Sequence, residues 1–290
     1  MHRQPRMARA SWIASGVRTT TQPLLYVADT YAYEVAVYMQ QGRNQNPVGE
    51  ITNGITFPTG VWVDQYRNLW VSNTYGELES NILRFPQGST KPDRTLADPN
   101  WNADDVWVAP DGSVYAINSG YSGNFEIVKY PPHKTVSQPV GDPYLTSDIT
   151  AIAGDTSGNL FASGLGVSGG GEVDELPAGS TQWQNTGIPL MEPGGLAFDR
   201  EGHLVVSDIG REVVEVFSLG HKKPREIIQC SAQCWAIALN HRAKRLWVDE
   251  VNDLNGTIDE FSYQKAQFVE TLAQPSNSYP LGLATTPDLY

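Results

Sequence analysis

Six evenly spaced positions in the chain could supply ligands to a metal ion. They are Asp29, Asn73, Asn118, Gly164, Asp208 and Glu250, which lie 44, 45, 46, 44 and 42 residues apart. Five of the six carry a side-chain oxygen, the donor that Ca²⁺ or another hard divalent cation takes. Gathered around one channel, they would form a carboxylate and amide ring able to support metal-dependent hydrolysis. In the alternative hypothesis each residue caps the turn after its own strand, and its recurrence in nearly every repeat favours this structural role.

Other catalytic arrangements are missing from the sequence. The five histidines are His2, His133, His203, His221 and His241, and all are predicted in the N-terminal arm or in turns. No Ser/His/Asp set can be assembled from the spacing of the sequence. We therefore expect a non-catalytic protein, with a metal-dependent hydrolase as the alternative.

The two cysteines, Cys230 and Cys234, lie in the sequence Cys-Ser-Ala-Gln-Cys. With no second Cys or His pair nearby, they do not form a zinc-binding pattern. They fit a small-loop disulfide in an exported protein and equally two buried thiols, so both states remain open.

Four tyrosines fall in loops on one predicted face of the molecule. They are Tyr31, Tyr33, Tyr75 and Tyr121. Tyrosine offers a large contact area at low entropic cost, which suits recognition of a protein, peptide or glycan. The competing interpretation is that these rings fold over the edges of neighbouring strands.

A sequence repeat positions these residues. Its clearest copy has a first strand over 58–64, a second over 67–73 and a third over 82–85, and a similar copy starts at Gly194. The second strands begin at markers with the spacing given above, which matches the ~40–45-residue period of four-stranded propeller blades. A polar turn and a weaker fourth strand follow each third strand, as expected at an outer edge.

The ends of the chain break the repeat in a complementary way. The first copy starts at its second strand, Leu24–Asp29, whereas residues 279–285 read as a lone first strand. We therefore predict an all-β, six-bladed propeller in which the C-terminal strand completes a blade with three N-terminal strands from residues 24–52. Closure of the ring leaves no open inter-blade face. Residues 1–23 are expected to form a flexible basic arm and residues 24–290 a single propeller domain.

The repeat resembles known propeller families. Its pattern, seen in Pro58-Thr59-Gly60-Val61 and Asn68-Leu69-Trp70-Val71-Ser72-Asn73, is similar to NHL repeats and to the senescence-marker-protein/gluconolactonase superfamily, and is nearest to uncharacterised bacterial propellers. The resemblance implies a six-bladed fold over about residues 24–287 and favours an extracellular or periplasmic location. It also implies a lactonase site, but the Glu-Gly-Pro element is absent. The Pro-x-Gly turns carry Thr59, Gly194 and Leu281, and Asp104 occupies the corresponding region of the third repeat. Only Asp29 and Asp208 match the Asp element, so lactone hydrolysis is disfavoured.

Charge excludes some classes of partner. Residues 1–23 hold four Arg and no acid, which leaves 16 basic and 32 acidic side chains, a net charge of −16, in the rest. Such a body repels nucleic acid and anionic lipid. No apolar run is long enough for a transmembrane helix, and Trp12-Ile13-Ala14 is too short for the core of a signal peptide. We expect a monomer, because a closed propeller has no long unpaired edge.

Overall fold

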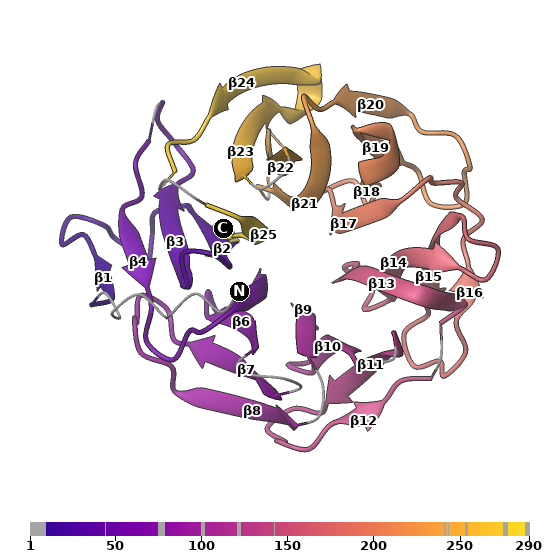
Figure 1. Cartoon of the computed structure of the whole chain (residues 1–290), viewed down its shortest axis with the longest axis horizontal. Helices are drawn as coiled ribbons and strands as arrows, with labels where there is room; N and C mark the ends of the chain where they lie inside the picture. Colours follow the sequence, from indigo (N-terminus) through magenta and orange to yellow (C-terminus); the bar gives the residue numbers. More distant parts are fainter. Residues whose placement is uncertain are drawn as a thin grey trace.

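The computed structural model describes residues 10–43, 45–74, 79–99, 102–120, 123–141, 143–240, 242, 244–252, 255–274 and 278–287. Its strands form six antiparallel sheets arranged as blades around a central axis, as Figure 1 shows. This confirms the predicted six-bladed propeller. No helix among these residues is long and apolar enough to cross a membrane.

The blades are named A to F here, and each runs from an inner to an outer strand. The inner strands, from A to F, are β25 (Pro280–Thr285), β5 (Pro58–Val63), β9 (Asn102–Val108), β13 (Leu145–Gly154), β17 (Pro193–Phe198) and β21 (Gln233–Leu239). The second strands are β2 (Leu24–Asp29), β6 (Leu69–Thr74), β10 (Val114–Ser119), β14 (Leu160–Gly166), β18 (Leu204–Asp208) and β22 (Arg245–Asn252). The third strands are β3 (Glu34–Met39), β7 (Glu79–Phe85), β11 (Phe125–Tyr130), β15 (Gly171–Leu176), β19 (Val213–Phe217) and β23 (Asn255–Ser262). The outer strands are β4 (Gly49–Ile51), β8 (Arg94–Pro99), β12 (Gln138–Pro139), β16 (Gln184–Asn185), β20 (Glu226–Gln229) and β24 (Gln267–Thr271).

Blade A closes the ring as predicted. Its inner strand β25 pairs with β2, in a register that runs from Leu25 opposite Thr285 to Asp29 opposite Pro280. Beyond the ladder, the N–H of Leu24 donates to Thr286 Oγ1 and the N–H of Thr286 donates to the Leu24 carbonyl, both at 2.8 Å. The two ends of the chain are therefore held by one another.

The predicted N-terminal arm is described from residue 10 onward, and residues 11–14 lie against blade A. Strand β1 (Trp12–Ile13) pairs with the outer strand β4 and makes blade A five-stranded. The Ser11 hydroxyl accepts hydrogen bonds from the N–H groups of Thr52 and Asn53, at 2.8 and 3.0 Å. This part of the arm therefore covers the edge that β4 would otherwise expose.

The hydrophobic core is divided among the seams between blades. One cluster joins Val37 and Val71 across the A–B seam, and another joins Val214 and Val248 across the E–F seam. Strands packed on both faces need apolar side chains at successive positions, which explains why β2 is buried throughout.

Each seam also carries a hydrogen bond from a polar side chain to the backbone of the neighbouring inner strand. At A–B, B–C, D–E, E–F and F–A the donor is a hydroxyl: Thr30 to the Pro58 carbonyl, Thr59 to Ala103, Ser163 to Gly194, Ser207 to Trp235, and Thr285 to Leu239. At C–D the group is instead a carboxylate, because Asp105 Oδ2 accepts from the N–H of Ile152 at 3.0 Å.

Candidate functional site

The polar ring predicted from the sequence lies at the ends of the second strands, where its side chains hold loops. Asp208 accepts hydrogen bonds from the N–H groups of Met191 and Glu192, at 2.8 and 3.1 Å, in the loop that leads into inner strand β17 of its own blade. Asn73 accepts in the same way from Thr56 and Phe57 before β5. The bonded loop connects the outer strand of the preceding blade to the inner strand of the same blade, so these residues hold the connections between blades.

Other members of the ring repeat this arrangement. Glu250 Oε2 accepts from the N–H groups of Ser231 and Ala232, at 2.7 and 3.0 Å. Asp29 accepts from the N–H of Tyr279 at 3.1 Å and also caps its own following turn through Ala32. Asn118 is buried at the corresponding end of β10. These bonds support the structural interpretation of the ring.

Blade D has Gly164 at the ring position, where no side chain can hold the loop. Asp174, from the third strand β15, takes over and accepts from the N–H of Tyr144 at 2.6 Å before inner strand β13. Burial raises the pKa of Asp174 to about 6, against the lowering effect of that bond. A carboxylate from a different strand thus performs the same task, which the spacing of the repeats could not reveal.

The ring carboxylates belong to separate loops in separate blades. Among the described residues, the one group of His, Cys, Asp and Glu compact enough to hold a metal is Asp199, Glu201 and His203. Asp199 already accepts from the N–H groups of Glu201 and His203, at 3.0 and 2.8 Å, and from the Tyr263 hydroxyl at 3.0 Å. It therefore shapes the turn between β17 and β18. Binding of Ca²⁺ or another divalent cation stays a prediction.

The two cysteines form a disulfide between Cys230 and Cys234. It closes the short loop between β20 and β21, and both residues are buried. The loop is the one that Glu250 holds, so the covalent bond and the carboxylate stabilise the same segment.

Two of the four predicted loop tyrosines are described, and both belong to aromatic pairs. Tyr31 stacks on Tyr279 with ring centroids 4.7 Å apart and remains 45% exposed. Tyr33 lies 6.5 Å from Phe57, which is 38% exposed. Tyr75 and Tyr121 fall outside the described residues. We call the side of the propeller formed by the strand 2–3 and strand 4–1 loops the loop face.

A central channel of about 1020 Å³ runs between the six inner strands. Turns between first and second strands, including those with Tyr66, Arg67 and Arg200, contribute to its lining. These turns border a mouth of the channel on the side opposite the loop face.

Every inner strand has one extra residue relative to its second strand at the same height, and β13 has a second register shift between Leu145 and Asp148. The register shifts lie between Pro58 and Val61, at Asp104, at Thr150, and at the corresponding places in the other three blades. Such β-bulges re-aim side chains. In blade C the bulge falls at Asp104, next to Asp105, and both line the channel.

The channel lining breaks the sixfold repetition at two levels. At the level of Asp105, the other blades have Gly60, Ala151, Gly195, Ala236 and Gly282. Two residues further along each strand, blades B and C have Trp62 and Trp107, whereas the others have Ala153, Ala197, Ala238 and Ala284. One wall thus carries a carboxylate and two indoles, and the opposite wall carries small side chains.

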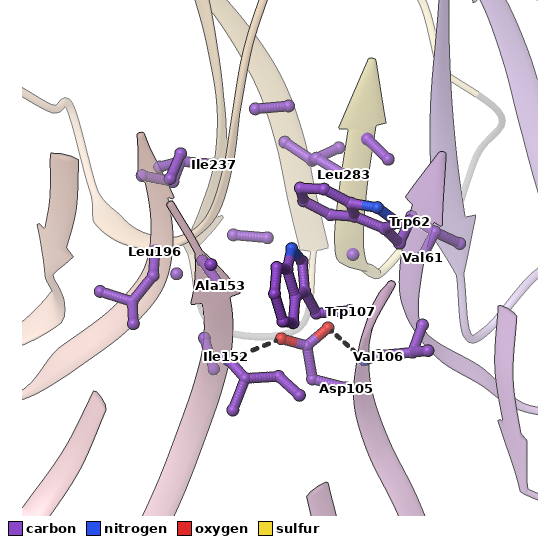
Figure 2. A pocket seen from close by; sticks show the side chains of 18 of the residues that line it. Val61, Trp62, Asp105, Val106, Trp107, Ile152, Ala153, Leu196, Ile237 and Leu283 are labelled. Atoms are coloured by element: carbon purple, nitrogen blue, oxygen red, sulfur yellow. Dashed lines mark hydrogen bonds between the residues drawn. The ribbon is translucent and has the colours of Figure 1, made fainter. Parts of the chain in front are cut away.

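Figure 2 shows this wall, with the Asp105 carboxyl bonded to β13 and to its own strand and both indoles in the pocket. Asp105 Oδ1 accepts from the N–H of Val106 at 2.8 Å. Trp107 packs against Gly154 of β13, where any Cβ would overlap the indole. Aliphatic side chains, among them Ile152 and Leu283, form the surroundings.

Burial perturbs the acids of the channel. It raises the pKa of Asp105 to about 7 despite two backbone N–H donors, and the negative charge of Asp104 adds to the increase. Burial likewise raises the pKa of Asp104 to about 6, where a bond from Ser119 opposes it and Asp148 reinforces it. Perturbed acids in a cavity are a physical sign of a binding or reactive site.

No single motif in the sequence marks Asp105, Trp62 or Trp107 as a site residue. A comparison among the repeats themselves contains the signal, because an Asp replaces Gly or Ala in one copy and Trp replaces Ala in two. The spacing of the repeats preserves this signal, because Asp105 and Gly60 both lie nine residues before the start of their second strands.

Comparisons with known proteins identify the fold. Neither a known family model nor a curated protein matches the sequence. A solved chain from a nidogen/laminin complex superimposes with a TM-score of 0.75 at 15% identity, covering 91% of this chain and 98% of that one. TolB from Acinetobacter baumannii gives 0.72 at 11% identity, with coverages of 93% and 68%. A protein of unknown function from Bacteroides caccae gives 0.65 at 12%, with coverages of 92% and 99%. These likenesses support the propeller fold, and the NHL and gluconolactonase resemblance stays a prediction.

Proposed function

We propose that the protein is a non-catalytic binding module that recognises a protein, peptide or glycan partner on its loop face. The observation that carries this proposal is the exposed stack of Tyr31 on Tyr279. Stacking orders the Tyr31 ring before a partner arrives, so less side-chain entropy is lost on binding.

Other side chains on the loop face support the same role. Tyr144, Val167 and Met191 are also exposed on the loop face, at 54%, 77% and 59%. The loops that carry Tyr144, Met191 and Tyr279 are held by Asp174, Asp208 and Asp29. Apolar side chains on fixed loops give a preorganised contact surface. One structural neighbour was solved in a nidogen/laminin complex, which illustrates a propeller in a protein assembly.

The proposal is tested by binding selections against a peptide display library and a glycan array. We expect ligands from one of these two sources to bind the wild type and to lose at least tenfold in affinity on Tyr31→Ala. Tyr66→Ala is the matched control, because Tyr66 is an exposed tyrosine (70%) in a turn on the opposite face. Selected ligands that respond equally to both substitutions, or to neither, would refute recognition by the loop face, as would the absence of any ligand.

A further inference from the structure

The wall of the channel formed by Asp105, Trp62 and Trp107 is more elaborate than the fold requires. Four blades place Ala at the position of the indoles, and five place Gly or Ala at the position of Asp105. The propeller therefore closes and packs with small side chains at both levels. Trp107 is buried in the core at the C–D seam, whereas Asp105 and Trp62 remain partly exposed at the channel, which points to a purpose other than packing.

Asp105 holds the C–D seam, but this task does not require a charge. The other five seams are tied by neutral hydroxyls. A buried carboxylate carries a desolvation cost that a neutral group avoids. Its two backbone bonds occupy about half of the roughly four acceptor positions that a carboxylate offers. Acceptor capacity therefore remains at a side chain that lines the channel.

Charge within the channel has one sign. In the lining described for the inner strands, Asp104, Asp105 and Asp148 are the charged residues, and Lys, Arg and His are absent. The basic lining residues, Arg67, Arg200 and Arg242, come from the turns around the mouth. A positive group in the channel would compensate the acids, and the face of the half-buried Trp62 would attract the same charge through the ring quadrupole, whereas Trp107 is almost fully buried beside it.

The size of the cavity selects the class of ligand. At about 1020 Å³ it lies at the upper end of the usual range for small-molecule pockets, so it accommodates an organic molecule rather than a bare ion. The aliphatic side chains of Ile152, Leu196 and Leu283 require an apolar body. From this geometry we propose that the channel binds a small organic ammonium ion, with its cationic head at Asp105 and its apolar or aromatic body along the indoles. This site is separate from the loop face.

Phenethylammonium serves as the probe, and 2-phenylethanol, a neutral analogue of similar size, is its comparison. Both are titrated into the wild-type protein, with tryptophan fluorescence and saturation-transfer NMR as readouts. We expect saturable binding of the amine, at least tenfold tighter than that of the alcohol. Equal affinities, or no saturation by the amine up to its solubility limit, would overturn the proposal.

Variants locate the site. Asp105→Asn should bring the amine to the affinity of the alcohol and leave the alcohol unchanged. Asp155→Asn is the matched control, because Asp155 also lines the channel but belongs to an exposed turn at the mouth, and it should bind the amine as the wild type does. Trp62 is half-buried, and Trp62→Leu should lower the affinity for both probes. This variant tests the proposal even if Asp105→Asn fails to fold. Unchanged amine binding in both channel variants would refute the site. Tyr31→Ala should leave amine binding intact, so a failure here and a failure of loop-face recognition are distinguishable.

Discussion

The acid at the C–D seam makes stability depend on pH in an unusual direction. Burial raises the pKa of Asp105 from 3.8 to about 7, so the folded protein favours its protonated form. The stabilisation that comes from protonation of the buried Asp105 is therefore fully present below pH 3.8, the pKa of the group in the unfolded chain. It is lost progressively as the pH rises through the folded value near 7.

The size of the effect follows from the shift. Three pKa units at 1.36 kcal/mol each correspond to at most about 4 kcal/mol over the whole window. About 3 kcal/mol of this falls between pH 5 and pH 8. The exposed part of the carboxyl faces the channel rather than the outer surface, which is why burial dominates.

Asp105→Asn removes the charge and keeps an oxygen that can accept from the Ile152 N–H. We expect the free energy of unfolding of the variant, minus that of the wild type, to increase by about 3 kcal/mol from pH 5 to pH 8. The assay is urea denaturation of the unliganded protein, followed by fluorescence and circular dichroism and interpreted where the two transitions coincide. The other acids titrate alike in the variant and the wild type, so their effect cancels when the two free energies of unfolding are subtracted. Asp104 is the exception, because its charge interacts with that of Asp105.

Thr59→Val provides the control. It deletes the neutral seam bond from Thr59 Oγ1 to the Ala103 carbonyl at 2.7 Å. The loss should be about 1 kcal/mol and the same at both pH values. If the stability curves of Asp105→Asn and the wild type stay parallel between pH 5 and pH 8, the assignment of a buried, high-pKa acid to this seam is wrong.

Three further perturbations test the fold. Deleting residues 277–290 removes β25 and opens the seams on both of its sides, so the truncated chain should lose its cooperative thermal transition, and a melting curve like that of the full chain would refute closure by this strand. Gly154→Ala should destabilise by about 1–3 kcal/mol in urea denaturation, since the added methyl group meets the Trp107 indole, whereas unchanged stability would mean that the indole can move away freely. Asp174→Ala should cost about 1–3 kcal/mol and speed hydrogen exchange at the Tyr144 amide, which it binds at 2.6 Å, and unaltered exchange would show that the loop is held by other contacts.

The sequence was sufficient to predict the architecture, because each repeat carries its own strand and turn pattern. The missing first strand before Leu24 and the surplus strand near Pro280 identified the closure directly. Such local patterns are sufficient because each repeat packs in the same way against its two neighbouring repeats.

The site was less predictable, because its features depend on contacts between different parts of the chain. Asp208 caps the following turn by accepting from the N–H of Arg211, as a strand-end Asp suggests, but its bonds to the loop before β17 reach back along the chain and had no local signal. Asp174 acts from a strand where the repeat has no such residue. Asp105 occupies the position of Gly60 in the repeat, but only the assembled ring shows that this position faces the channel. Docking of residues 11–14 on blade A depends on an edge that exists only after folding.

Closure by β25 also determines how the molecule responds to mechanical force. Residues 24 and 286 lie at the same end of the antiparallel pair of β2 and β25, and their two reciprocal hydrogen bonds are the outermost of the pair and the first that tension would load. Tension between the two ends of the propeller would load the hydrogen bonds of this pair one after another, as in a zipper, rather than all at once in shear. The guanidinium of Arg67 donates to the carbonyls of Gln22 and Pro287, directly outside the outermost pair of hydrogen bonds. One side chain from blade B thus fastens both strands at the point where peeling would begin.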